Sequence, residues 1–117
     1  MKVAIIGSRG LRVPIPEDAI PKNTTRIISG AANGIDRMAR AYALEHHIPI
    51  YEVLPDYGRY GKVAPLRRND AIIDAADYVL AIWDGKSRGT AYVIDRCRRL
   101  RKPLRVLRIR VQTGEKR

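Results

Sequence analysis

Three glycine-rich segments carry the residues of this chain that are best suited to binding chemistry. They are Gly7-Ser8-Arg9-Gly10, Ser29-Gly30-Ala31-Ala32-Asn33-Gly34 and Asp84-Gly85-Lys86-Ser87-Arg88-Gly89-Thr90. Glycine lets the backbone come close to a ligand, and the N–H groups at a helix start attract anions. A tight turn also requires glycine, so each segment alone is a weak signal. Taken together, with Arg9, Arg68 and Lys86 able to reach one crevice, they predict a site for a phosphate-bearing ligand.

Known nucleotide-binding motifs do not explain these segments. Gly85-Lys86-Ser87 is similar to the end of a Walker A loop, but that loop needs a glycine where this chain has Leu80. Gly30 and Gly34 do not complete a G-x-G-x-x-G dinucleotide fingerprint.

Catalytic and metal-binding patterns are not found either. His46 and His47 are neighbours, and neighbours on a helix point apart, so neither is predicted as a metal ligand or catalytic group. Cys97 shares helical spacing with Val93 and Leu100, which predicts a core position. As the single cysteine, it excludes an internal disulfide and zinc sites with paired cysteines. No Ser/His/Asp set is placed for nucleophilic catalysis, and no metal site is predicted.

The elements that position these segments alternate between strand and helix. Apolar runs without strict alternation, typical of strands buried on both faces, cover Lys2–Ile6, Arg26–Ser29, Ile48–Leu54, Tyr78–Trp83 and Leu104–Val111. Helical spacing covers Ile35–His46, Pro65–Ala76 and Gly89–Leu100, with one short turn at Glu17–Pro21. Asn33 is predicted to cap the first helix, with Asp36 as its capping acid.

This alternation predicts an α/β fold with a parallel sheet covered by helices on both faces. In such sheets ligands bind beyond the carboxyl ends of the strands. The three glycine-rich segments follow the first, second and fourth predicted strands. The sequence therefore predicts that they meet at one edge of the sheet.

The segment Ile28-Ser29-Gly30-Ala31-Ala32-Asn33-Gly34-Ile35-Asp36 resembles the S-G-G-A-x-G-I-D segment of the SLOG superfamily. This superfamily includes the DNA-processing protein DprA (Smf) and the cytokinin-activating LOG enzymes. Further matches, in the family's order, are Gly7-Ser8-Arg9, Arg68-Asn69 and Ser87-x-Gly89-Thr90. Tyr60-Gly61-Lys62, Ala64-Pro65 and Arg68-Asn69 are closer still to a small branch of stand-alone, uncharacterised members. The resemblance spans Lys2 to about Arg108.

The resemblance implies a Rossmann-like three-layer αβα sandwich of about five parallel strands in the order 3-2-1-4-5. It also implies a nucleotide-type ligand, with Arg68 pairing with phosphate and Gly89-Thr90 cradling phosphate at a helix start. The complete set of residues predicted to bind this ligand is Gly7, Ser8, Arg9, Ser29, Gly30, Asn33, Gly34, Arg68, Asn69, Asp84, Gly85, Ser87, Gly89 and Thr90.

Two positions depart from the family pattern. Ala31 stands where the family often has a second glycine. The LOG motif P-G-G-x-G-T-x-x-E places its catalytic glutamate at the position of Val93, which supplies no acid, base or charge. Asp84 or Asp36 could substitute for that glutamate, so an N-glycosidic hydrolase activity is left open and no catalytic residue is assigned.

Composition and charge further limit the functions that the chain could have. The chain has 117 residues, of which 45% are hydrophobic and 30% charged, as expected for one soluble domain, predicted over 1–111 with a frayed tail at 112–117. No apolar run is long enough for a membrane span and no signal peptide is recognised, so a cytoplasmic location is expected. The net charge of +11 suggests an anionic partner, and ten basic residues against one acid lie between Arg96 and Arg117.

Three functions follow as hypotheses. The first is a sensor or carrier that binds a nucleotide or an ADP-ribose-like ligand, with no cofactor assigned. The second is a LOG-like nucleoside monophosphate phosphoribohydrolase. The third is a DprA-like module for single-stranded DNA, which the charge favours, although stacking aromatics near the crevice are few. Any other nucleic-acid binding is expected to be weak. The resemblance to the superfamily also implies a homodimer or a larger homo-oligomer.

Overall fold

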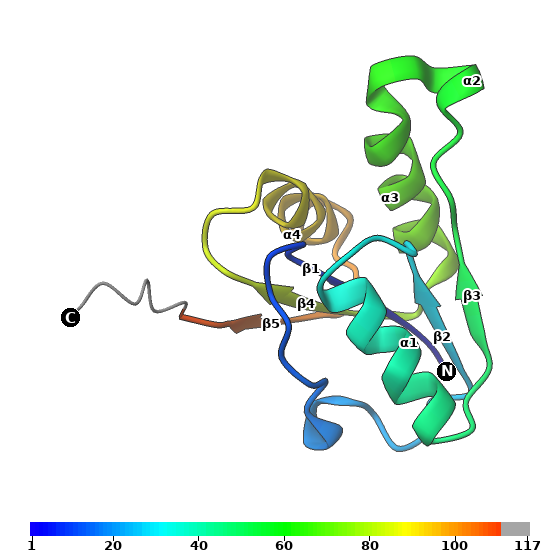
Figure 1. Cartoon of the computed structure of the whole chain (residues 1–117), viewed down its shortest axis with the longest axis vertical. Coiled ribbons are helices and arrows are strands. Elements are labelled where there is room, and N and C mark those ends of the chain that lie inside the picture. Colours follow the sequence, from blue (N-terminus) through cyan, green and yellow to red (C-terminus); the bar gives the residue numbers. More distant parts are fainter. Residues whose placement is uncertain (111–117) are drawn as a thin grey trace.

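Five short apolar runs form the strands of one parallel sheet in the computed structural model, which describes residues 1–110 (Figure 1). The sheet order is β3-β2-β1-β4-β5, and the strands are β1 (Lys2–Gly7), β2 (Arg26–Ser29), β3 (Ile50–Glu52), β4 (Tyr78–Trp83) and β5 (Leu104–Arg108). In the central pair, Gly7 at the end of β1 is level with Ile82 in β4. The predicted Rossmann-like α/β fold and its strand order are confirmed.

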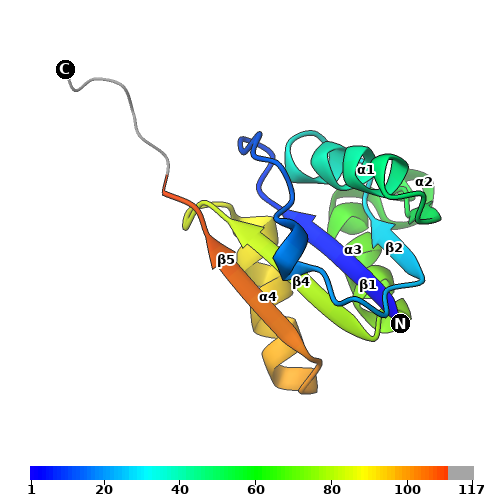
Figure 2. The ribbon, with the colours of Figure 1, turned by 90° about the horizontal axis from the view of Figure 1, so that it is seen from below.

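Helices cover both faces of this sheet (Figures 1 and 2). On one face lie α1 (Ile35–Glu45) and the connection between β1 and β2, which holds only the 3-10 turn η1 (Glu17–Ala19). On the other face lie α3 (Ala64–Ala75) and α4 (Arg88–Leu100). The short helix α2 (Tyr57–Tyr60) and the 3-10 turn η2 (Gly61–Val63) precede α3.

The core consists of two apolar clusters, one on each face of the sheet. Ile5, Leu80 and Ile82 face α1 and the β1–β2 connection, whereas Ala4 and Val79 face α3 and α4. The four residues after the first in both β1 and β4 are buried. Burial on both faces explains why these strands are continuous apolar runs.

Several predicted boundaries differ from the structure. The strands Arg26–Ser29 and Tyr78–Trp83 have the predicted ends, but β3, a half-exposed edge strand, covers only Ile50–Glu52 of the predicted Ile48–Leu54. β5 ends at Arg108, and the predicted strand residue Val111 and tail 112–117 lie outside the described residues. The sequence did not predict α2.

The predicted N-cap of α1 is wrong. Gly34, not Asn33, is the capping residue, and no side chain caps the helix. Gly34 has a φ of 74°, a conformation that glycine adopts freely and other residues rarely adopt. Asp36 lies within the first turn, and its carboxylate accepts a hydrogen bond from the Ala32 N–H at 3.1 Å.

Within residues 1–110, no helix is long and apolar enough to cross a lipid bilayer. Over the same residues, no cluster of three or more His, Cys, Asp or Glu side chains is arranged to hold a metal ion.

Candidate functional site

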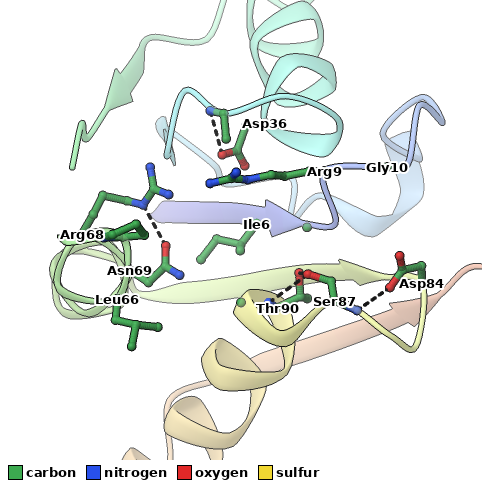
Figure 3. A pocket seen from close by; sticks show the side chains of 14 residues that line it. Ile6, Arg9, Gly10, Asp36, Leu66, Arg68, Asn69, Asp84, Ser87 and Thr90 are labelled. Carbon is green, nitrogen blue, oxygen red and sulfur yellow. Dashed lines mark hydrogen bonds between the residues drawn. The ribbon is translucent and has the colours of Figure 1, made fainter. Parts of the chain in front are cut away.

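A cleft of about 310 Å³ opens where the carboxyl ends of β1 and β4 meet. These strands separate the two halves of the sheet, since the chain runs from β1 towards β3 and then crosses to β4 and β5. Ligands of open α/β sheets bind at this type of topological switch point. We call it the switch-point cleft, and its lining residues are Ile6, Gly7, Arg9, Gly10, Ala32, Asp36, Pro65, Leu66, Arg68, Asn69, Asp84, Ser87, Gly89 and Thr90 (Figure 3).

The N-terminus of α4 forms one wall of the cleft. Ser87 is its N-cap, and its hydroxyl accepts a long hydrogen bond from the Thr90 N–H at 3.5 Å. The N–H groups of Arg88 and Gly89 belong to the first turn, so they have no acceptor within the helix. Gly89 carries no side chain in front of them. This wall is suited to an anion, because free N–H groups and the helix dipole both attract negative charge.

Asp84 holds the loop that leads into α4. One of its carboxylate oxygens accepts the N–H groups of Lys86 and Ser87, both at 2.8 Å. These two hydrogen bonds lower the pKa of the Asp84 carboxyl below its usual value. The carboxylate therefore stays ionised beside the helix start, where it orders the loop and opposes a ligand that carries many negative charges.

Arg68 and Asn69 on α3 form the opposite wall. The Arg68 guanidinium is buried and donates to the Gly30 carbonyl at 2.6 Å and to the Val53 carbonyl at 3.4 Å. Its Nε donates to Asn69 Oδ1 at 2.9 Å, which leaves the amide nitrogen of Asn69 as a donor on the cleft wall. Arg68 therefore connects α3 to the segments that follow β2 and β3, in addition to lining the cleft. Sequence alone did not indicate this structural role.

Asp36 and Arg9 are the other two charged residues that line the cleft. The Asp36 side chain is buried, and this burial raises the pKa of its carboxyl despite the Ala32 N–H, Arg68 and Arg9 nearby. Figure 3 shows the Arg9 side chain extending across the end of β1 between Asp36 and the cleft. Arg9 is exposed, so it can reorient towards a bound anion without disturbing the core.

Two glycines are required by close packing around the cleft. A Cβ on Gly7 would lie 2.5 Å from the Ile82 carbonyl oxygen and 2.5 Å from the Ile35 side chain. A Cβ on Gly30 would lie 2.7 Å from Arg68 Nη1 and 2.9 Å from Asp36 Oδ2. Gly30 therefore allows this arginine and this acid to approach each other behind the cleft.

A second hollow of about 250 Å³ adjoins the switch-point cleft. It shares Arg9, Ala32 and Arg68 with the cleft, and Gly30, Ala31 and Asn33 from the β2–α1 loop line its far side. Ala31 adopts a φ of 60° there, which is a strained conformation for alanine and a relaxed one for glycine. Glycine at this position would adopt the same backbone conformation without strain.

The structure brings most of the predicted site residues to these two hollows. The switch-point cleft is lined by Gly7, Arg9, Arg68, Asn69, Asp84, Ser87, Gly89 and Thr90, and the second hollow by Gly30 and Asn33.

Four predicted residues lie behind this surface. Ser8 is buried, and its hydroxyl accepts the Asp84 N–H at 3.1 Å. Ser29 is buried near Asp36, and its hydroxyl has no hydrogen-bond partner within residues 1–110. Gly34 packs against the Arg9 carbonyl, and Gly85 packs against the Arg108 guanidinium. These residues shape the loops that carry the site.

Sequence reasoning missed the apolar lining of the cleft. Ile6, Pro65 and Leu66 line it beside the charged groups. Ile6 was assigned to a strand and Pro65 to a helix start, and no sequence pattern indicated that either would line the cleft. Asp36 was considered as a helix cap and as a substitute acid, and only its burial beside Arg68 makes it a part of the site.

Other reactive residues lie away from the cleft. Val93 and Cys97 are fully buried in the cluster beneath α4, and burial raises the pKa of the Cys97 thiol. His46 follows the far end of α1, where it stacks on Tyr42 with ring centroids 4.0 Å apart. Neither the cysteine nor this histidine can contact a ligand in the switch-point cleft.

Comparisons with protein-family models, with curated proteins and with solved structures find no match to this chain.

Proposed function

We propose that this chain binds a nucleotide or a nucleotide-derived, phosphate-bearing ligand in the switch-point cleft, as a sensor or ligand carrier. The observation that carries the proposal is the pairing of the open α4 N-terminus with Arg9 and Arg68 across one cleft. Backbone N–H groups and guanidinium groups are the two kinds of donor that bind phosphate best. The resemblance to the SLOG superfamily supports the same ligand class.

The remaining lining residues fit the other parts of such a ligand. Ile6, Pro65 and Leu66 provide apolar contact for a base or sugar, and the amide of Asn69 provides a donor. The ionised Asp84 carboxylate offsets part of the charge of the two arginines. A ligand with few phosphates fits this balance better than a triphosphate.

Replacing Gly89 by alanine tests the phosphate position without disturbing the fold. A Cβ on Gly89 would meet no atom within 4 Å, and alanine favours a helix over glycine by about 1 kcal/mol. Gly89→Ala should therefore keep or raise thermal stability while its methyl group enters the cleft. We expect affinity for AMP, ADP or ADP-ribose, measured by calorimetry, to fall about tenfold or more through lost N–H contacts to phosphate.

Gly58→Ala is the matched control, because Gly58 lies in α2 outside the cleft and its Cβ would meet only Asp56 Oδ1 at 3.7 Å. It should bind like the unchanged chain. Equal affinities of the Gly89 variant and the control would reject the proposed phosphate position. Mass spectrometry of small molecules that copurify with the protein would identify the natural ligand.

A phosphoribohydrolase is the second candidate, and the burial of Asp36 is the observation that favours it. A carboxyl with a raised pKa beside a cleft is suited to act as a general acid. Val93 lies in the core and supplies no such group. Incubation with nucleoside monophosphates, followed by chromatography for free base, separates the candidates: turnover that Asp36→Asn abolishes would support the hydrolase, and no turnover would support the sensor.

A homodimer and a cytoplasmic location belong to this proposal as well. Light scattering and cell fractionation are the measurements that test them.

A further inference from the structure

The outer edge of β5 has main-chain groups that can pair with another strand. β5 is the last strand of the sheet, and no strand within residues 1–110 pairs with its outer side (Figure 2). On its inner side, the Val79 N–H donates to the Pro103 carbonyl at 2.9 Å and the Ile109 N–H donates to the Trp83 carbonyl at 2.8 Å.

These two hydrogen bonds fix which residues of β5 face outwards. Main-chain groups of a parallel strand alternate between its two neighbours, so the odd-numbered residues of β5 pair with β4. Leu104, Val106 and Arg108 consequently direct their N–H and C=O groups towards the open edge. An extended chain that added to this edge would find a regular row of donors and acceptors.

An apolar hollow lies beside this edge, between α4 and β5. It has a volume of about 170 Å³ and is lined by Trp83, Ala91, Ile94, Asp95, Arg98 and Val106. One aliphatic side chain would fill much of it. Because Val106 contributes both to the hollow and to the open row of main-chain groups, a peptide paired at the edge would have a side chain next to the hollow.

The charge around this edge is mainly positive. The exposed side chains there are basic and are contributed by Arg98, Arg101, Arg105, Arg108 and Arg110. The acid that lines the hollow, Asp95, pairs with Arg99 at 3.0 Å. A partner that docks on this edge therefore needs acidic side chains.

We propose that the outer edge of β5 binds an extended acidic peptide segment of another protein by adding it to the sheet as a sixth strand. The peptide main chain pairs with Leu104, Val106 and Arg108, one aliphatic side chain fills the hollow, and flanking carboxylates contact the arginines. Charge-assisted hydrogen bonds between carboxylates and guanidinium groups supply affinity, and the main-chain pairing fixes the register. The hollow shares no lining residue with the switch-point cleft, and the proposal does not depend on the ligand of that cleft.

Two other occupants fit the surface less well. A second copy of the chain paired edge to edge would bring the rows of arginine together, and like charges on paired strands repel. A polynucleotide would satisfy the arginines, but it would use neither the row of main-chain groups nor the apolar hollow. In the experiment below, each of these two occupants would give a result different from that of the acidic peptide.

The experiment uses a fluorescein-labelled peptide of alternating glutamate and valine, with the full chain. Fluorescence anisotropy should show saturable binding, and amide hydrogen exchange should slow at Val106 and Arg108. Exchange at Arg105 and Leu107 should hardly change, because these amides are already paired with β4. A peptide of alternating lysine and valine should bind far more weakly.

Two variants separate the contributions of main chain and charge. Val106→Pro removes one outward N–H while the pairing with β4 remains, and proline is tolerated on edge strands. It should weaken peptide binding about fivefold, the value of one hydrogen bond. The double change Arg105→Glu and Arg108→Glu should weaken binding further, whereas Arg37→Glu on α1, which makes a single charge reversal away from the edge, should change it little.

Several results would overturn the proposal. They are failure of the peptide to bind, equal binding of the lysine peptide, and unchanged exchange at Val106 and Arg108 in the bound state. Tighter binding of labelled oligo-dT than of the peptide, with no change of amide exchange, would identify a polynucleotide surface instead. A dimer that dissociates in Val106→Pro would identify a second copy as the occupant.

Discussion

Asp36 shows how a single residue gains a chemical property that its sequence position does not reveal. Its carboxyl lies near Arg9 and Arg68, and both guanidinium groups favour the ionised form. Burial outweighs them, and the pKa of the carboxyl is raised above the ordinary 3.8. The folded chain therefore holds the Asp36 proton more tightly than the unfolded chain does.

This raised pKa predicts how stability depends on pH. A group whose pKa is higher in the folded state stabilises the fold at low pH, and this contribution is lost as the pH rises through the folded-state pKa. The free energy of unfolding, compared with that of Asp36→Asn, should therefore fall as the pH rises from 3.8 upward. Urea unfolding of both proteins over a pH series measures it.

Comparing the two proteins at each pH removes the contributions of the groups that titrate equally in both. A difference from Asp36→Asn that grows with rising pH would mean that the two arginines outweigh burial and that the pKa of Asp36 is lowered.

Arg68 matters at the scale of whole elements, because it joins the carboxyl ends of two strands to a helix. From α3 it donates to the Gly30 carbonyl after β2 and to the Val53 carbonyl after β3. β3 has only three residues, so few other hydrogen bonds hold this corner of the sheet. The guanidinium thus positions the loop that carries Gly30 to Gly34.

Loss of Arg68 should accordingly reduce stability as well as ligand binding. Arg68→Ala leaves two carbonyl groups without their donor, and we expect a cost of about 1–3 kcal/mol in the free energy of unfolding. Arg68→Lys should recover only part of it, because an ammonium group lacks the planar fork of donors. The neighbouring exposed Arg67 is the control, and Arg67→Ala should change stability by less than about 0.5 kcal/mol. If Arg68→Ala unfolds at the same temperature as the unchanged chain, the Arg68 hydrogen bonds to Gly30 and Val53 do not stabilise the fold as proposed.

The elements that sequence predicted well are those whose signal is local. β2 and β4 are apolar runs with a clear end, and both have the predicted boundaries. α1 begins at Ile35 as predicted, but its N-cap was misassigned, because Asn33 is a good capping residue by type, whereas the close approach of the chain to the Arg9 carbonyl selects Gly34. α2 has a single turn capped by Asp56 and has no apolar periodicity to detect.

At the scale of the whole molecule, the sequence predicted the edge of the sheet where the candidate site lies. It did not predict which residues line the cleft and which support them from behind. The alternation of strands and helices brings the glycine-rich segments to one edge whatever their side chains do. Which side chains line the cleft and which support it depends on contacts between distant segments, such as Ser8 with Asp84 and Arg68 with Gly30. No local pattern encodes these contacts.

The distribution of the net charge of +11 leads to the last prediction. Eight basic residues and no acid lie between Arg96 and Arg110, in the second half of α4 and on β5, whereas the switch-point cleft is lined by two arginines and by the acids Asp36 and Asp84. Binding of single-stranded DNA should therefore be weak, insensitive to sequence and steeply reduced by salt, because it releases many counterions. Binding of a nucleotide in the cleft should depend less on salt, since it involves fewer and better shielded charges.

Both affinities can be measured across one salt series with two sets of variants. Arg98→Glu and Arg101→Glu change exposed arginines of the basic surface and should reduce DNA binding and its salt slope while nucleotide binding is retained. Arg9→Ala changes an exposed arginine of the cleft and should have the opposite selectivity. If DNA binds tightly near physiological salt and depends on Arg9 rather than on the basic surface, the cleft itself recognises the DNA strand. A DprA-like function would then replace the nucleotide sensor, because the groups assigned to a single phosphate would be reading a polynucleotide backbone.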